Sequence, residues 1–314
     1  MNSPADIKGM ELCRRYYREA CLPVIQNEFP DKLSRMAFGL VGDGSECYGF
    51  DDMISRDHDF GPRIQVWLTA EDYKDFGEPL QELIGSLSKS FLGFEGVNTS
   101  EYGEGREGVF TVGGFYTRFI GMPRAPETLR EWRLLPEVNL SIATNGEVWS
   151  DPPGEFSGIR AVLKAGYPAD VRHKKLAARA MKAAQSGQYN YSRSLRRKES
   201  VAAAMAKAEF MESACSMIYL LNDSYRPFYK WMHRGLSALP FLGQEAYRLI
   251  KRLAETPDGA DAAQTIEEIS ALIISGLREK GLTGSNSDFL LDHAPYIQRE
   301  IKDPYLRGLP VFAE

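Results

Sequence analysis

The apolar pattern of the chain changes at about residue 160, and this change limits the folds available to it. Before that point, short apolar runs predict strands at MAFGLVG (36–42), RIQVWLT (63–69) and GVFTV (108–112), with VNLSIAT (138–144) and GEVWSDP (146–152) as further candidates. After that point, helical periodicity continues and strand-like runs are nearly absent. The pattern predicts an α+β domain over residues 1–160, followed by an all-helical domain over 161–314.

Two helical stretches accompany the predicted strands. Residues 8–28 carry apolar positions at helical spacing, and Pro30 and Asp31 end the pattern. Residues 71–91 return to a helical period. We therefore expect both stretches to be helical.

The length and composition are those of a protein that folds without disulfide bonds or a structural metal ion. The 314 residues are 43% apolar and 26% charged, which is typical of globular proteins and suggests about two domains. No apolar run approaches the roughly 20 residues that a membrane helix needs, and the N-terminus lacks a secretory pattern. Four separated cysteines without a CxxC pair indicate reduced thiols. We expect a cytoplasmic protein without a membrane partner.

The net charge of -5 is unevenly distributed. Residues 1–159 carry 15 basic and 26 acidic side chains, residues 160–207 carry 12 and 2, and residues 208–314 carry 11 and 15. The basic segment at 160–207 fits either a polyphosphate or nucleic-acid partner, or pairing with acidic parts of the same chain.

The stretch from Gly42 to Gly61, GDGSECYGFDDMISRDHDFG, carries the clearest chemistry. A predicted strand delivers the chain to Gly44 and Ser45, where a glycine allows close backbone approach and a serine suits the cap of a following helix. Free N–H groups at such a helix start bind phosphate. On a strand, Asp57 and Asp59 point to the same side, so that their oxygens suit Mg²⁺. The other interpretation is an acidic, solvated loop.

The order Gly44-Ser45-x-x-x-Gly49 followed by Asp57-x-Asp59 resembles the signature of the DNA polymerase β-like nucleotidyltransferase superfamily. More narrowly, the chain is similar to an uncharacterised bacterial family of nucleotidyltransferase-like proteins with a helical C-terminal domain. Further matching segments are GEVWSDPPGEF (146–156) and FMESACSMIYLLNDSYRPFYKW (210–231). The resemblance implies a small mixed sheet with flanking helices, then a helical bundle.

The resemblance also implies roles for individual residues. Asp57 and Asp59 would hold Mg²⁺ on a nucleoside triphosphate, whose phosphates would contact Gly44 and Ser45. The superfamily usually adds a third carboxylate on a later strand, but GVFTV contains no acid. Glu107 lies just before this strand and is our candidate. Glu137 and Glu147 remain further candidates.

The helical half offers cations for the remaining phosphate charge. Arg193 and Arg197 are four residues apart and would share a helix face, and Lys230 follows Pro227 near a predicted helix start. We expect Arg197 and Lys230 to bind nucleotide across a cleft from the aspartates. Four tyrosines add aromatic surface (Tyr189, Tyr191, Tyr219 and Tyr225). The other interpretation is a helical bundle with surface arginines and core tyrosines.

Three functions follow from these residues. The first is Mg²⁺-dependent transfer of a nucleoside monophosphate from a triphosphate to a hydroxyl of a small-molecule or protein acceptor. The second is a nucleotide-binding regulatory protein with little or no catalysis, because the third acid is missing from its strand. The third is an RNA-modifying transferase, suggested by the basic segment, although no RNA-binding motif is present and we expect no nucleic-acid partner.

Overall fold

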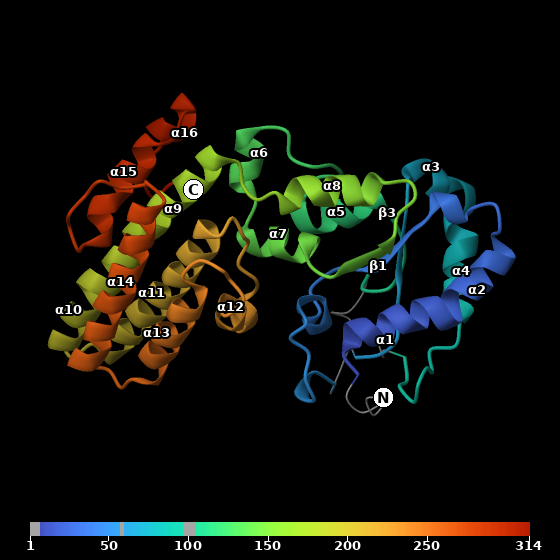
Figure 1. Ribbon diagram of the computed structural model, residues 1–314, viewed down its shortest axis with the longest axis horizontal. Helices are drawn as coiled ribbons and strands as arrows, with labels where there is room; N and C mark the ends of the chain where they lie inside the picture. The colour runs from blue at the N-terminus through green and yellow to red at the C-terminus, as the bar shows by residue number, and fades with distance from the viewer. Residues whose placement is uncertain (1–6, 57–59, 97–104) are drawn as a thin grey trace. The chain divides into compact units, whose positions relative to one another are not determined.

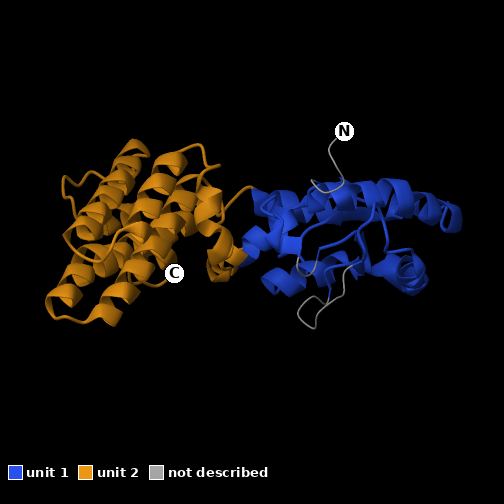
Figure 2. Cartoon of the chain, turned by 90° about the horizontal axis from the view of Figure 1, so that it is seen from below, with its two compact units in different colours: residues 1–125, 139–164 blue, residues 126–138, 165–314 orange. Residues whose placement is uncertain are grey.

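The computed structural model (Figure 1) describes residues 7–56, 60–96 and 105–314. The chain divides into two compact units, coloured separately in Figure 2. The N-terminal unit comprises residues 1–125 and 139–164, and the helical unit comprises residues 126–138 and 165–314. Residues 126–138 thus belong to the helical unit although they lie between two parts of the N-terminal unit in sequence.

The N-terminal unit is built around one four-stranded mixed sheet. Its strands are β1 (Ala37–Leu40), β2 (Gln65–Leu68), β3 (Gly108–Thr111) and β4 (Glu147–Ser150), in the spatial order β3-β2-β1-β4. β1 pairs antiparallel with both β2 and β4, whereas β2 and β3 are parallel. The prediction of an α+β chain with a small mixed sheet is confirmed.

The strand register brings several loops to one edge of this sheet. Gly39 pairs with Gln65, and Gln65 pairs with Gly108 on its other side. Leu40 pairs with Glu147. The end of β1 therefore lies beside the starts of the other three strands.

Helices cover both faces of the sheet. Successive side chains of a strand point to opposite sides, so the apolar residues of β2 pack against helices on each face. Val66 and Leu68 pack in a cluster with Tyr17 and Leu80 from the N-terminal and α4 helices. On the other face, the Trp67 ring stacks on Phe156 with centroids 3.8 Å apart. In the described residues of this unit, the helices, with their 3-10 and π-helical turns, are α1 (Gly9–Tyr16), η2 (Tyr17–Cys21), α2 (Leu22–Glu28), η3 (Leu33–Arg35), η4 (Ser45–Tyr48), η5 (Ile54–Arg56), α3 (Ala70–Asp72), η6 (Tyr73–Gly77), α4 (Glu78–Ser86), α5 (Val112–Ile120), α8 (Glu155–Lys164) and most of α7 (Glu137–Thr144).

The predicted helix at 8–28 forms as α1, η2 and α2 in succession. The π-helical turn lies just before Pro23, which has no N–H and whose ring displaces the carbonyl one turn earlier. A proline within a helical pattern thus widens the helix instead of ending it.

The helical unit contains α6 (Leu129–Leu134), α9 (Ala169–Ala183), η8 (Ala184–Tyr191), α10 (Ser192–Arg196), α11 (Ser200–Leu221), α12 (Tyr229–Leu236), α13 (Gly243–Glu255), α14 (Ala260–Glu279), η9 (Leu290–His293), α15 (Ala294–Arg299) and α16 (Pro304–Gly308). α11 is its central helix and buries Phe210, Met217 and Leu221. In residues 165–314, all of which the structure describes, there is no strand. In the described parts of both units, no helix has the length and apolarity needed to cross a bilayer.

One predicted strand is wrong, and the four cysteines are unpaired, as the sequence predicts. VNLSIAT forms the helix α7 (Glu137–Thr144), in which Leu140 and Ala143 are buried one helical turn apart. Its apolar residues therefore follow a helical spacing rather than an alternation. All four cysteines are buried and free.

Candidate functional site

The glycine–serine loop begins where β1 ends and leads into the short 3-10 helix η4. Ser45 does not cap this helix, which corrects the prediction from the sequence. Gly44 is extended (φ -69°, ψ 148°) and takes the N-cap position, so Ser45 is already inside the first turn. Because η4 has only four residues, its dipole is small. Phosphate binding here would depend on loop N–H groups and the serine hydroxyl.

Three glycines shape this loop for different reasons. Gly42 has φ +151° and open space where a side chain would begin, and Gly49 has φ +68°. Both conformations disfavour residues with a Cβ. At Gly44, a Cβ would lie 2.1 Å from Oε1 of Glu46. A side chain at Gly44 would therefore require the Glu46 carboxylate to move, whether or not a ligand approaches.

The loop is fixed by side chains from distant parts of the N-terminal unit. The Asn145 amide donates to the carbonyl of Gly42 at 2.5 Å and accepts from its N–H at 3.0 Å. The side-chain oxygen of Gln65 accepts from the N–H of Val41 at 2.8 Å. These bonds satisfy backbone N–H and carbonyl groups at the start of the loop.

A buried ion pair connects the loop to the entrance of β2. Glu46 is 7% exposed and Arg63 is 3% exposed, and their side chains are in direct contact. Burial disfavours the charge of Arg63, but nearby acidic groups, with Glu46 the strongest among them, together outweigh burial and raise the arginine's pKa. The arginine is therefore charged, and its contact with Glu46 holds the chain that enters β2 beside the loop.

A small pocket opens between the loop and three arginines, Arg63, Arg106 and Arg118. Arg106 lies 3.3 Å from Asp43, and Arg118 donates to the carbonyl of Gly105 at 2.7 Å. The free volume of about 10 Å³ has room for a single water molecule. A space of this size does not hold a triphosphate.

The predicted metal ligands, Asp57 and Asp59, lie outside the described residues, as does His58. They precede Phe60 and the entrance to β2 in the sequence. Within the ranges that the structure describes, no group of three His, Cys, Asp or Glu side chains is arranged to hold a metal ion.

Two of the three candidate third acids lie at the sheet edge that carries the loop. Glu107 directly precedes β3, and its carboxylate pairs with Lys89 at 2.5 Å. Glu147 begins β4 and binds Arg14 through both oxygens, at 2.5 and 2.9 Å. Each acid already has a cationic partner.

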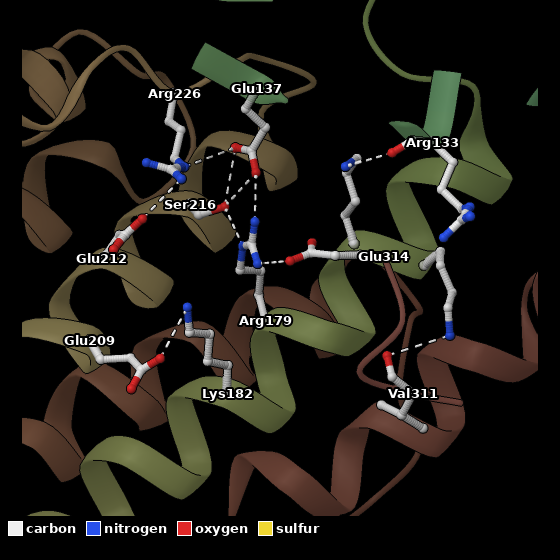
Figure 3. Close-up of polar contacts among 12 residues, drawn as sticks. Arg133, Glu137, Arg179, Lys182, Glu209, Glu212, Ser216, Arg226, Val311 and Glu314 are labelled. Carbon is white, nitrogen blue, oxygen red and sulfur yellow. Dashed lines mark hydrogen bonds and ion pairs between the residues drawn. The ribbon is translucent and has the colours of Figure 1, made fainter. Parts of the chain in front are cut away.

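Glu137, the third candidate, is part of a buried ionic cluster in the helical unit (Figure 3). Its carboxylate accepts from the Ser216 hydroxyl at 2.9 and 3.1 Å. Nitrogens of Arg179 and Arg226 lie 3.5 and 3.8 Å away. These contacts favour a structural role within this unit.

The same cluster uses much of the basic segment. Arg179 also contacts Glu314, and Lys175 donates to the carbonyl of Arg133 at 3.2 Å. The buried ammonium of Lys174 donates to Gln298 at 2.9 Å and to the carbonyls of residues 309–311. Further pairs are Arg172 with Asp223 and Lys182 with Glu209. Pairing with acidic residues of the same chain, one of the two interpretations of this segment, thus accounts for Arg172, Arg179 and Lys182, whereas Lys174 and Lys175 donate to neutral groups.

The predicted phosphate-binding cations of the helical unit lie on its surface. Arg197 is the exposed C-cap of α10, and its N–H bonds the carbonyl of Arg193 at 3.2 Å, so the two are one turn apart. Lys230 is exposed on α12, with its ammonium 5.2 Å from the Trp231 ring centre. The cleft that we predicted around Arg197 and Lys230 stays a prediction.

The four tyrosines divide between core and surface. Tyr191 and Tyr219 are buried, whereas Tyr189 is half exposed and lies against the guanidinium of Arg193 at 4.6 Å. Tyr225 is partly buried and packs against Tyr167, with ring centroids 5.1 Å apart. The core interpretation is therefore correct for Tyr191 and Tyr219.

Sequence reasoning missed Glu46, Arg63, Gln65 and Asn145, which hold the loop. Two of these residues, Gln65 and Glu46, could have been recognised from the sequence. Gln65 is a polar residue inside an apolar strand pattern, and such a residue needs a buried partner. Glu46 lies within the glycine–serine motif itself.

Part of the chain matches a known family model. The model, described as a domain of unknown function (DUF4037), covers residues 132–232, about a third of the chain. This region contains the ionic cluster residues Glu137, Arg179, Ser216 and Arg226, together with Lys230. An uncharacterised domain agrees with the narrower of the two resemblances. Searches of curated proteins and of solved structures gave no match.

Proposed function

We propose that the chain is a Mg²⁺-dependent nucleotidyltransferase of the polymerase β-like class. It would transfer a nucleoside monophosphate from a nucleoside triphosphate to a hydroxyl of a small-molecule or protein acceptor, with release of pyrophosphate. When bound, Mg²⁺ would neutralise phosphate charge and orient the triphosphate. The sequence resemblance and the sheet edge together support this proposal.

The observation that carries the proposal is the register at the sheet edge. Because Gly39 pairs with Gln65, the loop after β1 and the chain entering β2 lie side by side. The loop contains the phosphate-binding candidates, and the chain entering β2 follows the two aspartates directly in the sequence. A phosphate cradle beside a pair of carboxylates is the arrangement that metal-assisted attack on phosphorus requires.

The residues divide into three roles in this proposal. Gly44 and Ser45 contact phosphate, and Asp57 and Asp59 hold the metal. Glu107 accepts the acceptor's proton or completes the metal site, since it precedes the strand that is parallel to β2. For this role it must leave Lys89.

One observation favours a second candidate, a nucleotide-binding protein with little or no catalysis. Glu107, Glu137 and Glu147 all have cationic partners. If none leaves its partner, a triphosphate binds but is not turned over.

Pyrophosphate release separates the two candidates. The assay uses the full chain with Mg²⁺ and each of the four ribonucleoside triphosphates, both alone and with a mixture of hydroxyl-bearing acceptors and proteins. The proposal expects Mg²⁺-dependent release by the wild type and its loss in Asp57→Asn and Asp59→Asn. Asp52→Asn is a matched control in the same loop, where an amide can still accept the bonds from Ile54 and Ser55. Release that is equal in all four proteins contradicts the assignment.

A further inference from the structure

The helical unit contains a cavity that the proposed function does not use. It has a volume of about 520 Å³ and lies between α11, α12 and α13. This volume is within the range of sites that bind small molecules. Ligand binding at this cavity does not depend on the nucleotidyltransferase proposal.

The floor of the cavity is buried and apolar. Cys215 from α11, Met232 from α12 and Ile250 from α13 are 2%, 7% and 3% exposed. Burial raises the pKa of the Cys215 thiol to about 12, so this floor carries no charge at neutral pH. Three helices thus enclose a hydrophobic base.

The open space exists because small residues form the walls. Ala208 on α11 and Ala254 on α13 line the cavity and are both exposed to it and to solvent. Each contributes only a methyl group. A large side chain at either position would occupy the volume that these residues leave open.

The rim combines polar and aromatic groups. Glu212, Glu255 and Lys251 line the opening, so two of its three charged side chains are acidic. Glu212 pairs at 2.9 Å with Arg226, which does not line the cavity, and one oxygen of Glu255 lies 3.8 Å from the Lys251 ammonium. The Nε2 of His233 is 2.9 Å from the carbonyl of Tyr247 and donates to it. Tyr229, 70% exposed, forms an aromatic edge.

We infer that this cavity binds an amphiphilic small molecule with an apolar, ring-sized body and a protonated amine. The body fills the space above Cys215, Met232 and Ile250. The amine lies at the rim, where Glu212 and Glu255 accept its hydrogen bonds. An anionic head is disfavoured because it faces the same two carboxylates.

Three compounds with one ring body test the inference. 1-Naphthylmethylamine is cationic, 1-naphthalenemethanol is neutral and 1-naphthoate is anionic at neutral pH. Their affinities for the full chain are measured by calorimetric titration. We expect saturable binding in the order amine, alcohol, acid, with about a fivefold step for each change of charge at this exposed rim.

Cavity-filling variants test the location. Ala254→Phe and Ala208→Phe each place a ring in the cavity and should weaken binding of the amine about tenfold or more. Ala204→Phe is the matched control, because it is exposed on the same helix but does not line the cavity. Glu255→Gln should reduce the preference for amine over alcohol and leave alcohol binding unchanged.

Melting temperatures of all variants report whether they fold, and two filling variants on different helices guard against the failure of one. No saturable binding of any of the three compounds overturns the inference. So does equal binding by the wild type and a folded filling variant. A concentration-dependent dimer that Ala254→Phe dissociates overturns it as well, since the occupant is then a second copy of the chain.

Discussion

The buried carboxylate of Glu46 contacts the guanidinium of Arg63, and this one ion pair joins the glycine–serine loop to the entrance of β2. A side chain at Gly44 would displace the Glu46 carboxylate from its position beside Arg63. This contact holds the glycine–serine loop beside the start of β2. It involves neither the phosphate-binding candidates, Gly44 and Ser45, nor the two aspartates.

The ion pair predicts a strong and coupled effect on stability. Removing one partner leaves the other charge buried, which costs about 3–5 kcal/mol. Glu46→Gln and Arg63→Met should each lower the free energy of unfolding by about this amount, and the double variant should lose much less than their sum. Urea unfolding measures all three. The exposed pair Arg15 and Glu19 is the control, and its removal should leave stability unchanged. Additive losses at residues 46 and 63 would contradict the coupling.

The loop predicts different results for two neighbouring substitutions. Ser45→Ala removes one hydroxyl and should weaken triphosphate binding a few-fold without loss of stability. Gly44→Val should reduce both affinity and stability, because its Cβ overlaps the Glu46 carboxylate. Calorimetric titration and thermal melting measure the two properties. Gly158→Val, at a helical glycine with open space around it, should change neither. Wild-type affinity in Gly44→Val would mean that the loop does not contact phosphate.

Lys174 predicts a dependence of stability on pH. Burial, with a contribution from Arg133, lowers the pKa of Lys174 from 10.5 to about 8. Between these values the unfolded chain binds more protons, so the stability that a neutral Lys174 contributes is present above about pH 10 and is lost as the pH falls toward 8. Relative to Lys174→Met, the wild type should become more stable as the pH rises through this window.

Urea unfolding of both proteins at about pH 7, pH 9 and pH 10 tests this difference. The exposed Lys302→Met is the matched control and should show a constant difference from the wild type. A difference between wild type and Lys174→Met that stays constant or falls with pH is the contrary result.

Lys230 predicts an effect on ligand without an effect on the fold. If its ammonium binds phosphate, Lys230→Ala should weaken nucleotide binding about tenfold to a hundredfold. Thermal stability should change little, because the side chain is exposed and loses only its contact with the Trp231 ring. Lys280→Ala removes an ammonium in a similar position, 4.9 Å from the Phe241 ring centre, and should leave affinity unchanged. Equal affinities for both variants and the wild type would limit the helical unit to a scaffold or partner-binding role.

The sequence predicted the elements whose pattern is local. The strands at 37–40, 65–68 and 108–111 and the long helical stretch after residue 160 follow from apolar periodicity. VNLSIAT was misjudged because a short apolar run fits a strand and a helix equally well. Two features depend on contacts between distant segments, which no local pattern specifies. They are the parallel pairing of β2 with β3 and the place of residues 126–138 in the helical unit.

The candidate site was predictable only in its motif. The glycines and the aspartates form a spacing that a sequence reveals. Asn145 and Gln65 reach the loop from more than twenty residues away, and their roles depend on the strand register. Glu137 looked like one more acid in the sequence, but burial and Ser216 make it part of a cluster.

Binding of a non-hydrolysable nucleoside triphosphate with and without Mg²⁺ tests the central claim most directly, because it requires no knowledge of the acceptor. Titration calorimetry compares the wild type, Asp57→Asn, Asp59→Asn and the loop control Asp52→Asn. We expect Mg²⁺-dependent saturable binding by the wild type and Asp52→Asn, and about a tenfold or greater loss in the other two, since each lacks one metal ligand. Equal affinity in all four proteins, or binding that is independent of Mg²⁺, would contradict the nucleotidyltransferase account.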